Sequence, residues 1–195
     1  MPGADAPLPV HRSSLTIVFT FLKQIFASMW PRIPSTPQPP PEPVVPRKVD
    51  PILFQQTGPC SWFGGPSDTG VRVDEGLALW QPHELPLAPP GLFLRQQPAG
   101  TTGLARRLNP DAHYVACRWD YAALRKQGIP REILRACQVA VRRPDRPELG
   151  TVWAWPADWG PNQRTRRAAD LSPGLMKALQ LRTDDVVTVT LYAPR

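Results

Sequence analysis

The sequence contains few of the residues that build metal sites and disulfide frameworks. It has three cysteines, Cys60, Cys117 and Cys137, and three scattered histidines, and no two cysteines have CxxC spacing. This excludes a disulfide-dense scaffold and the common zinc-site patterns. We therefore expect no structural metal and no cofactor. Cys117 and Cys137 lie in separate apolar stretches, which favours buried free thiols, although a disulfide could form if these stretches were neighbouring strands.

The sequence also lacks an apolar stretch of the ~20 residues that usually cross a bilayer. After a flexible N-terminus over 1–12, residues 13–30 predict a hydrophobic helix whose apolar part spans roughly 16 residues. Three roles stay open: a signal anchor with Arg12 on its cytoplasmic side, an interfacial helix, or a helix that docks on a partner protein. A cleaved signal peptide is disfavoured because Lys23 interrupts the apolar run. We expect an anchor to a membrane or to a protein assembly.

Proline, by contrast, is abundant. The chain has 27 prolines and 13 glycines among 195 residues, which excludes long uninterrupted helices over most of its length. Nine prolines fall within residues 31–51, so the segment 31–52 is predicted to be an extended polyproline II spacer. A ligand for a proline-binding module is the alternative for this segment. One compact domain is expected after the spacer, over residues 53–195.

Residues 53–195 show the short, turn-bounded apolar runs of a β domain. The pattern predicts strands over 76–80, 113–117, 137–142, 152–155 and 186–192, separated by turns rich in Gly, Pro, Asn and Asp. Short helices are predicted over 121–127 and 173–179, the second with Ser172 as N-cap and Pro173 at its first position. No internal repeat of fixed long period is present, which excludes a solenoid or a propeller.

Positive charge is concentrated in the middle of the chain. The net charge is +7, and residues 95–146 hold eleven Arg or Lys against four acidic residues. Such an excess either favours an acidic partner or serves only as a solvated surface. Acidic partners include nucleic acid, anionic lipid and the carboxylate-bearing polymers of bacterial walls. Nucleic acid is disfavoured, because no nucleic-acid-binding motif accompanies the arginines and aromatic residues of 106–127.

One stretch near the end of the chain carries a family pattern. Residues 155–192 read WPADWGPNQRTRRAADLSPGLMKALQLRTDDVVTVTLY. They contain an Asp-x-Gly-Pro turn at 158–161, an Arg-x-x-Asp-Leu-Ser segment at 167–172, a short helix and a last strand. This order resembles the end of the RlpA-like double-psi β-barrel, a domain related to expansin-like proteins and to lytic transglycosylases. The resemblance implies a mostly β fold: a six-stranded double-psi β-barrel with short helices.

The sequence departs from the family pattern at three positions. Trp159 replaces the usual Arg of the turn, and Gln180 stands where Gly is common. Arg118 stands where the family has a histidine. Further upstream, the segment DTGVRVDEG offers three residues for the acidic position of the family: Asp68, Asp74 and Glu75. Of these, Asp68 is expected to form a turn.

The resemblance implies chemistry by carboxyl groups. In the related lytic transglycosylases one carboxyl group serves in turn as acid and base, and a muramyl hydroxyl is the internal nucleophile. Asp170 and Asp158 are the implied catalytic residues, with Glu75 as a third, and burial near a tryptophan would raise the pKa of such a group. The structural alternative is that Asp170 caps the following helix or binds turn amides.

The resemblance also implies contacts with substrate, for which Trp159, Arg167 and Arg118 are the candidates. Trp159 lies in a polar turn and is expected to be an exposed platform on which a sugar ring stacks. The expected partner is peptidoglycan or another acidic wall glycan, and the expected location is the cell envelope, membrane-anchored or periplasmic, or a virion.

Three functions stay open. The first is a peptidoglycan-directed domain that binds and cleaves glycan strands as a lytic transglycosylase-like enzyme. The second is a non-catalytic glycan-binding or expansin-like module, which the missing histidine favours. The third is a structural component of a phage virion or envelope assembly, in which residues 13–30 dock the chain.

Overall fold

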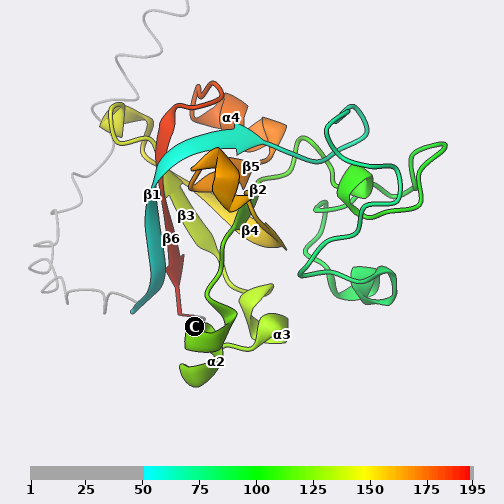
Figure 1. Ribbon diagram of the computed structural model, residues 1–195, viewed down its shortest axis with the longest axis horizontal. Coiled ribbons are helices and arrows are strands. Elements are labelled where there is room, and N and C mark those ends of the chain that lie inside the picture. The colour runs from blue at the N-terminus through cyan, green and yellow to red at the C-terminus, as the bar shows by residue number, and fades with distance from the viewer. Residues whose placement is uncertain (1–50, 194–195) are drawn as a thin grey trace, which may run out of the picture. The chain divides into compact units, whose positions relative to one another are not determined.

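The computed structural model describes residues 51–193, which form a mostly β fold with short helices. Six strands close into a barrel in the order β1-β5-β2-β4-β3-β6 (Figure 1). Their bounds are Ile52–Trp62 (β1), Tyr114–Cys117 (β2), Val139–Arg142 (β3), Thr151–Trp159 (β4), Ala169–Leu171 (β5) and Val186–Tyr192 (β6). Closure gives every strand two neighbours and leaves no free sheet edge. The predicted mostly β, six-stranded barrel is confirmed.

The helices are short and lie in the connections between strands. The α-helices are α2 (Tyr121–Lys126), α3 (Arg131–Leu134) and α4 (Pro173–Ala178), and 3-10 turns are formed by Pro82–Leu87, Ala105–Arg107, Pro147–Leu149 and Gln163–Thr165. The Ser172 hydroxyl accepts a hydrogen bond from the Leu175 N–H at 3.1 Å, which satisfies a free amide at the start of α4. The helices predicted over 121–127 and 173–179 and this N-cap are confirmed.

Two of the strand pairs in the barrel are parallel. β1 pairs antiparallel with β6 along its first part and then parallel with β5 along its last three residues. β2 lies between β5, to which it is antiparallel, and β4, to which it is parallel. β3 is antiparallel to both β4 and β6. Because parallel strands need long crossover connections, the chain between β2 and β4 passes through α2, α3 and β3.

The strand predictions are confirmed at four places and wrong at one. β2, β3, β4 and β6 match the predicted strands, although β4 continues beyond residue 155 to Trp159. Residues 76–80 form no strand among the described residues: Leu77, Leu79 and Trp80 are buried, but the backbone has no sheet partner. The pattern missed β1, which is rich in Gln, Thr, Gly and Pro, and β5, which has three residues.

The long connection from β1 to β2 extends to one side of the barrel, as Figure 1 shows in cyan to green. Its buried side chains join the barrel core: Leu77, Leu79, Trp80, Leu92, Leu104 and Leu108. Two parts of this connection touch closely at Gly103, where a Cβ would lie 2.1 Å from the Glu75 carbonyl oxygen. The Gly103 N–H donates to the Val73 carbonyl at 2.9 Å. Any side chain at position 103 would therefore displace the backbone that carries Glu75.

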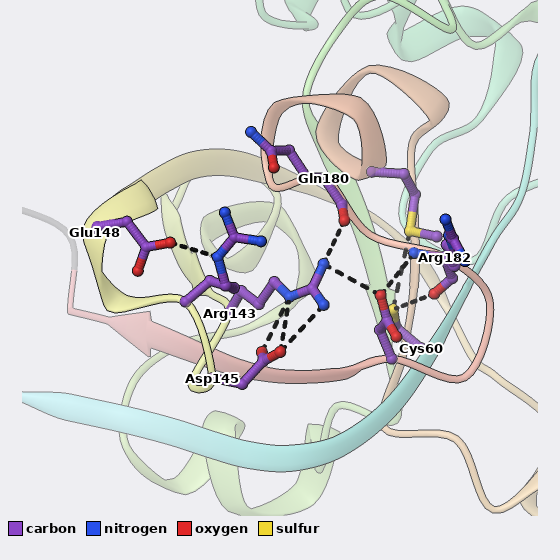
Figure 2. A network of polar contacts seen from close by, with 9 residues as sticks. Cys60, Arg143, Asp145, Glu148, Gln180 and Arg182 are labelled. Carbon is purple, nitrogen blue, oxygen red and sulfur yellow. Dashed lines mark hydrogen bonds and ion pairs between the residues drawn. The ribbon is translucent and has the colours of Figure 1, made fainter.

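The three cysteines are buried free thiols, which confirms the prediction for Cys117 and Cys137. Figure 2 shows Cys60 close to a polar network around Arg143, whose guanidinium group lies between Asp145 and the Gln180 carbonyl. This network joins the β3–β4 connection to the chain after α4. Burial raises the pKa of Cys60 to about 12, so its sulfur stays a neutral thiol at physiological pH. Cys60 is a packing residue.

Several sequence predictions fall on the first 50 residues. The flexible N-terminus over 1–12, the hydrophobic helix over 13–30 and the spacer up to residue 50 lie outside the described residues. In the part that is described, no helix has both the length and the apolar character needed to cross a membrane. Across residues 51–193, no cluster of three or more His, Cys, Asp or Glu side chains is arranged to hold a metal ion.

Candidate functional site

The two aspartates singled out from the sequence lie in one row across neighbouring strands. Ser61 on β1 pairs with Asp170 on β5, Asp170 pairs with Ala116 on β2, and Ala116 pairs with Asp158 on β4. Directly paired residues carry their side chains on the same face of a sheet. Because neighbouring strands are about 4.8 Å apart, the two aspartates lie about 10 Å apart at Cα. The small Ala116 separates them.

A β-bulge in β4 places Asp158 on this face. Val115 pairs with Pro156, but the next residue of β2, Ala116, pairs with Asp158, so that Ala157 is the extra residue. In a regular ladder Ala157 would oppose Ala116, and Asp158 would point to the other face. The bulge therefore brings the Asp158 carboxyl group onto the face that carries Asp170.

Asp158 is half-buried, and two backbone donors hold its carboxyl group. Its Oδ1 accepts hydrogen bonds from the Ala78 N–H at 2.6 Å and from the Trp159 N–H at 2.8 Å. The pKa of Asp158 is raised to about 6: burial is the largest cause, the two hydrogen bonds oppose the rise, and the charges of Glu75 and Asp170 add to it. About half of the molecules therefore carry a proton on this carboxyl group near pH 6.

Asp170 is also half-buried, and the Ser61 hydroxyl donates a hydrogen bond to its Oδ1. Burial raises the pKa of Asp170, while the Ser61 hydrogen bond and the charge of Arg167 oppose the rise. A Cβ at Gly160 would lie 3.7 Å from Asp170 Oδ2, so the lack of a side chain there leaves space beside this oxygen. The capping alternative for Asp170 is wrong, because Ser172 caps α4.

The two predicted arginines brace the loops around Asp170. Arg118 Nη1 donates to the Pro161 carbonyl at 3.2 Å and to the Arg167 carbonyl at 2.7 Å, which ties together the two ends of the loop between β4 and β5. Arg167 Nε donates to Asp184 Oδ1 at 2.9 Å. Both guanidinium charges lower the pKa of Asp170 and so favour its ionised form.

The acidic residues of the β1–β2 connection have separate roles. Glu75 is exposed, its Oε2 accepts from the Arg72 N–H at 3.0 Å, and its charge acts on Asp158. Asp68 is buried and accepts from the Gly64 N–H at 2.6 Å and the Gly70 N–H at 2.9 Å. Asp68 is therefore a turn former, as predicted.

Trp159 borders an open hollow at the end of β4. Its side chain is 41% exposed, which agrees with the exposed aromatic expected at this turn. The hollow has a volume of about 380 Å³ and is lined by Trp159, Gly160, Asn162 and Gln163. An exposed indole bordered by amide side chains offers both a stacking surface and hydrogen-bonding groups for a sugar.

The sequence motifs do not identify the residues that hold the hydrogen-bond donor of Asp158 in place. Arg131 Nη1 donates to the Ala78 carbonyl at 3.3 Å, and its Nη2 donates to Glu84 at 2.8 Å. Ala78 in turn donates to Asp158. Ser61 was missed as well. None of these residues belongs to a motif, so only the hydrogen bonds across the fold identify them.

Replacing Arg131 with methionine is expected to raise the pKa of Asp158 further. Without the Arg131 guanidinium group, the Ala78 carbonyl would lose a hydrogen-bond donor, and the backbone at Ala78 would move. The hydrogen bond from the Ala78 N–H to Asp158, which favours the ionised carboxylate, would then weaken. Carbon-13 NMR titration of the carboxyl group measures the change. The control is Arg125→Met on the exposed side of α2, which should leave the Asp158 titration unchanged. An unchanged midpoint in Arg131→Met would show that Arg131 does not position Ala78.

The fold and the site define a closed six-stranded β-barrel with two carboxyl groups on one face. The sequence matches no protein-family model, and its comparison with curated proteins found no match.

Proposed function

We propose that this domain is a double-psi β-barrel that binds peptidoglycan strands and cleaves them, with Asp158 as general acid and then base. The observation that carries the proposal is the row of Asp158 and Asp170 on one face, in which burial raises the pKa of Asp158 to about 6. The RlpA-like pattern of residues 155–192 and the two parallel strand pairs, β1–β5 and β2–β4, support the same barrel type. The proposed location is the cell envelope, or a virion that contacts the cell envelope.

The reaction needs no partner beyond the glycan. Protonated Asp158 donates its proton to the bridging oxygen, and the bond between that oxygen and the muramyl C1 breaks. The C6 hydroxyl of the same muramyl residue forms a bond to C1, and its proton passes to the Asp158 carboxylate. The products are a free hydroxyl group on one fragment and a 1,6-anhydro end on the other, and Asp158 is protonated again.

Asp170 has an electrostatic role in this scheme. The sugar carbon gains positive charge as the glycosidic bond breaks, and a fixed carboxylate on the same face stabilises that charge. The Ser61 hydroxyl holds one oxygen of Asp170 and fixes its orientation. Gly160 leaves space next to the other oxygen.

A non-catalytic glycan-binding module is the second candidate, and Arg118 favours it. Arg118 stands where the family has a histidine, and an arginine stays protonated and cannot act as general acid or base. Its Nη1 is already hydrogen-bonded to two carbonyl groups. A single Asp158 that acts as both acid and base needs no histidine.

Incubation with purified sacculi separates the two candidates. Mass spectrometry of the soluble products should detect anhydro-muropeptides with the wild-type chain and far less of them with Asp158→Asn. If sacculi retain the wild-type chain on sedimentation but release no anhydro product, the binding module is correct and the enzyme is excluded. If the chain neither sediments with sacculi nor releases product, both candidates are excluded.

A further inference from the structure

The loop over residues 160–167, which joins β4 to β5, is held in one conformation by its own polar groups. Asn162 Oδ1 accepts from the Arg164 N–H at 3.0 Å, and the Thr165 hydroxyl donates to the Asn162 carbonyl at 2.7 Å. Arg118 ties its two ends, as described above. Arg166 has a φ of 55°, a left-handed conformation that non-glycine residues seldom adopt and that often marks functional loops. The loop is therefore preorganised although its side chains are exposed.

Among residues 51–193, two arginines of this loop have no acidic partner. Arg164 and Arg166 are exposed, and neither guanidinium group makes a hydrogen bond or an ion pair with the residues that the structure describes. Three other arginines each pair with the acidic residue two positions further along the chain: Arg72–Asp74, Arg143–Asp145 and Arg146–Glu148. The loop therefore presents two positive charges to solvent.

These charges lie in the same short loop as the hollow beside Trp159. The hollow is lined by residues 159, 160, 162 and 163, which immediately precede Arg164. A glycan stacked on Trp159 would place the groups attached to its sugars over the rest of the loop. A guanidinium group binds a carboxylate with paired, charge-assisted hydrogen bonds, and an indole face and amide groups bind the sugar itself.

We infer that the loop 160–167 is a subsite for a carboxylate group carried by the glycan, and that Arg164 and Arg166 bind that carboxylate. The inference rests on the proposed glycan-directed function and narrows its substrate class to glycans that bear carboxylates. Peptidoglycan offers two sources of this group: the lactyl carboxylate of a muramyl residue without a peptide, and the carboxylates of the peptide stems.

Binding is tested with the full chain carrying Asp158→Asn, so that no strand is cleaved. The probes are soluble glycan strands with peptide stems, strands stripped to their lactyl carboxylates, the same stripped strands with those carboxylates amidated, and neutral chitin oligosaccharides. The test variant is Arg164→Gln with Arg166→Gln. The matched control is Arg125→Gln with Arg142→Gln, which removes the same charge from two other exposed arginines.

The test variant is expected to bind carboxylate-bearing strands about tenfold more weakly or worse, because charge-assisted contacts are lost. Its binding to amidated strands and to chitin should equal that of the control. A loss on stripped strands identifies the lactyl group, and a loss confined to strands with stems identifies the peptide. Equal losses in test and control variants, or no loss in either, would overturn the subsite.

The outcomes separate the subsite from the proposed function. If wild-type chain releases anhydro-muropeptides while the test variant binds every probe normally, the subsite is wrong and the function stands. If binding depends on Arg164 and Arg166 but no anhydro product forms, the subsite is correct and the cleavage is wrong.

Discussion

Replacing Asp158 with asparagine is expected to lower the rate of anhydro-muropeptide release by about 10²- to 10⁴-fold. Asparagine keeps the size of the side chain and an oxygen that can accept from the Ala78 and Trp159 N–H groups. It cannot donate and recover a proton as a carboxyl group does. Quantitative mass spectrometry of products released from sacculi measures the rate.

The matched control for this variant is Asp111→Asn. Asp111 is an exposed aspartate outside the row of Ser61, Asp170, Ala116 and Asp158, and its replacement should leave the rate at the wild-type level. Equal rates for Asp158→Asn and the wild-type chain would exclude Asp158 as the acid.

The same carboxyl group should set the pH dependence of cleavage and of stability. Because Asp158 has a pKa of about 6, kcat/KM should fall about tenfold for each pH unit above 6.

The ordinary pKa of the group is 3.8, so the folded state holds the proton more tightly, and stability falls as pH rises from about 4 to 6. This loss reaches about 3 kcal/mol at most. Urea unfolding at pH 4 and pH 7 measures this loss of stability, which should be absent in Asp158→Asn.

Replacing Glu84 with alanine is expected to destabilise the fold by about 3 kcal/mol. Glu84 is buried, and its Oε1 pairs with Arg131 at 2.8 Å and with Arg135 at 2.6 Å. The Arg135 guanidinium group lies 4.9 Å from the centre of the Trp80 ring and is itself buried. Without Glu84, this cation would stay in a buried position without its counter-ion. Urea unfolding at pH 7 measures the loss.

Glu148→Ala is the matched control, because Glu148 is exposed and also pairs with an arginine, Arg146. Its free energy of unfolding should equal that of the wild-type chain within error, since exposed ion pairs contribute little. Burial opposes ionisation of Glu84, but its contacts with Arg135, Gln81 and Arg131 hold its pKa below the ordinary 4.5. Its contribution is therefore present above pH 4.5 and is lost as pH falls through the lowered pKa. If Glu84→Ala and Glu148→Ala lowered the free energy of unfolding equally, burial of the Glu84 ion pairs would not contribute to stability.

The sequence predicted the strands in which apolar and polar side chains alternate and the helices whose first residues are a typical N-cap and proline. The strand at 186–192 alternates as VVTVTLY, and α4 begins at Ser172 and Pro173, so both were found with nearly correct bounds. β1 was missed because Gly58 and Pro59 lie within it, and such a pair is typical of a turn. Residues 76–80 were taken for a strand because burial of Leu77, Leu79 and Trp80 imitates the strand pattern.

The candidate site was predicted in its carboxyl groups but not in their support. Asp158 and Asp170 stood out because each belongs to a motif, and the register of β2 places them on one face. That placement depends on the bulge at Ala157, for which the sequence has no signal. The hydrogen bonds from Ser61 and Ala78 join residues 109 and 80 positions apart. No local pattern encodes contacts over such separations.

The proposed chemistry requires Asp158 to hold its proton far above the range of an ordinary aspartate, and carbon-13 NMR titration of its side-chain carboxyl group in the wild-type chain measures this directly. The expected midpoint is about pH 6, and it should fall in Asp170→Asn, because removal of that negative charge favours ionisation of Asp158. A midpoint near 3.8 would mean that Asp158 is an ordinary ionised aspartate and cannot be the acid.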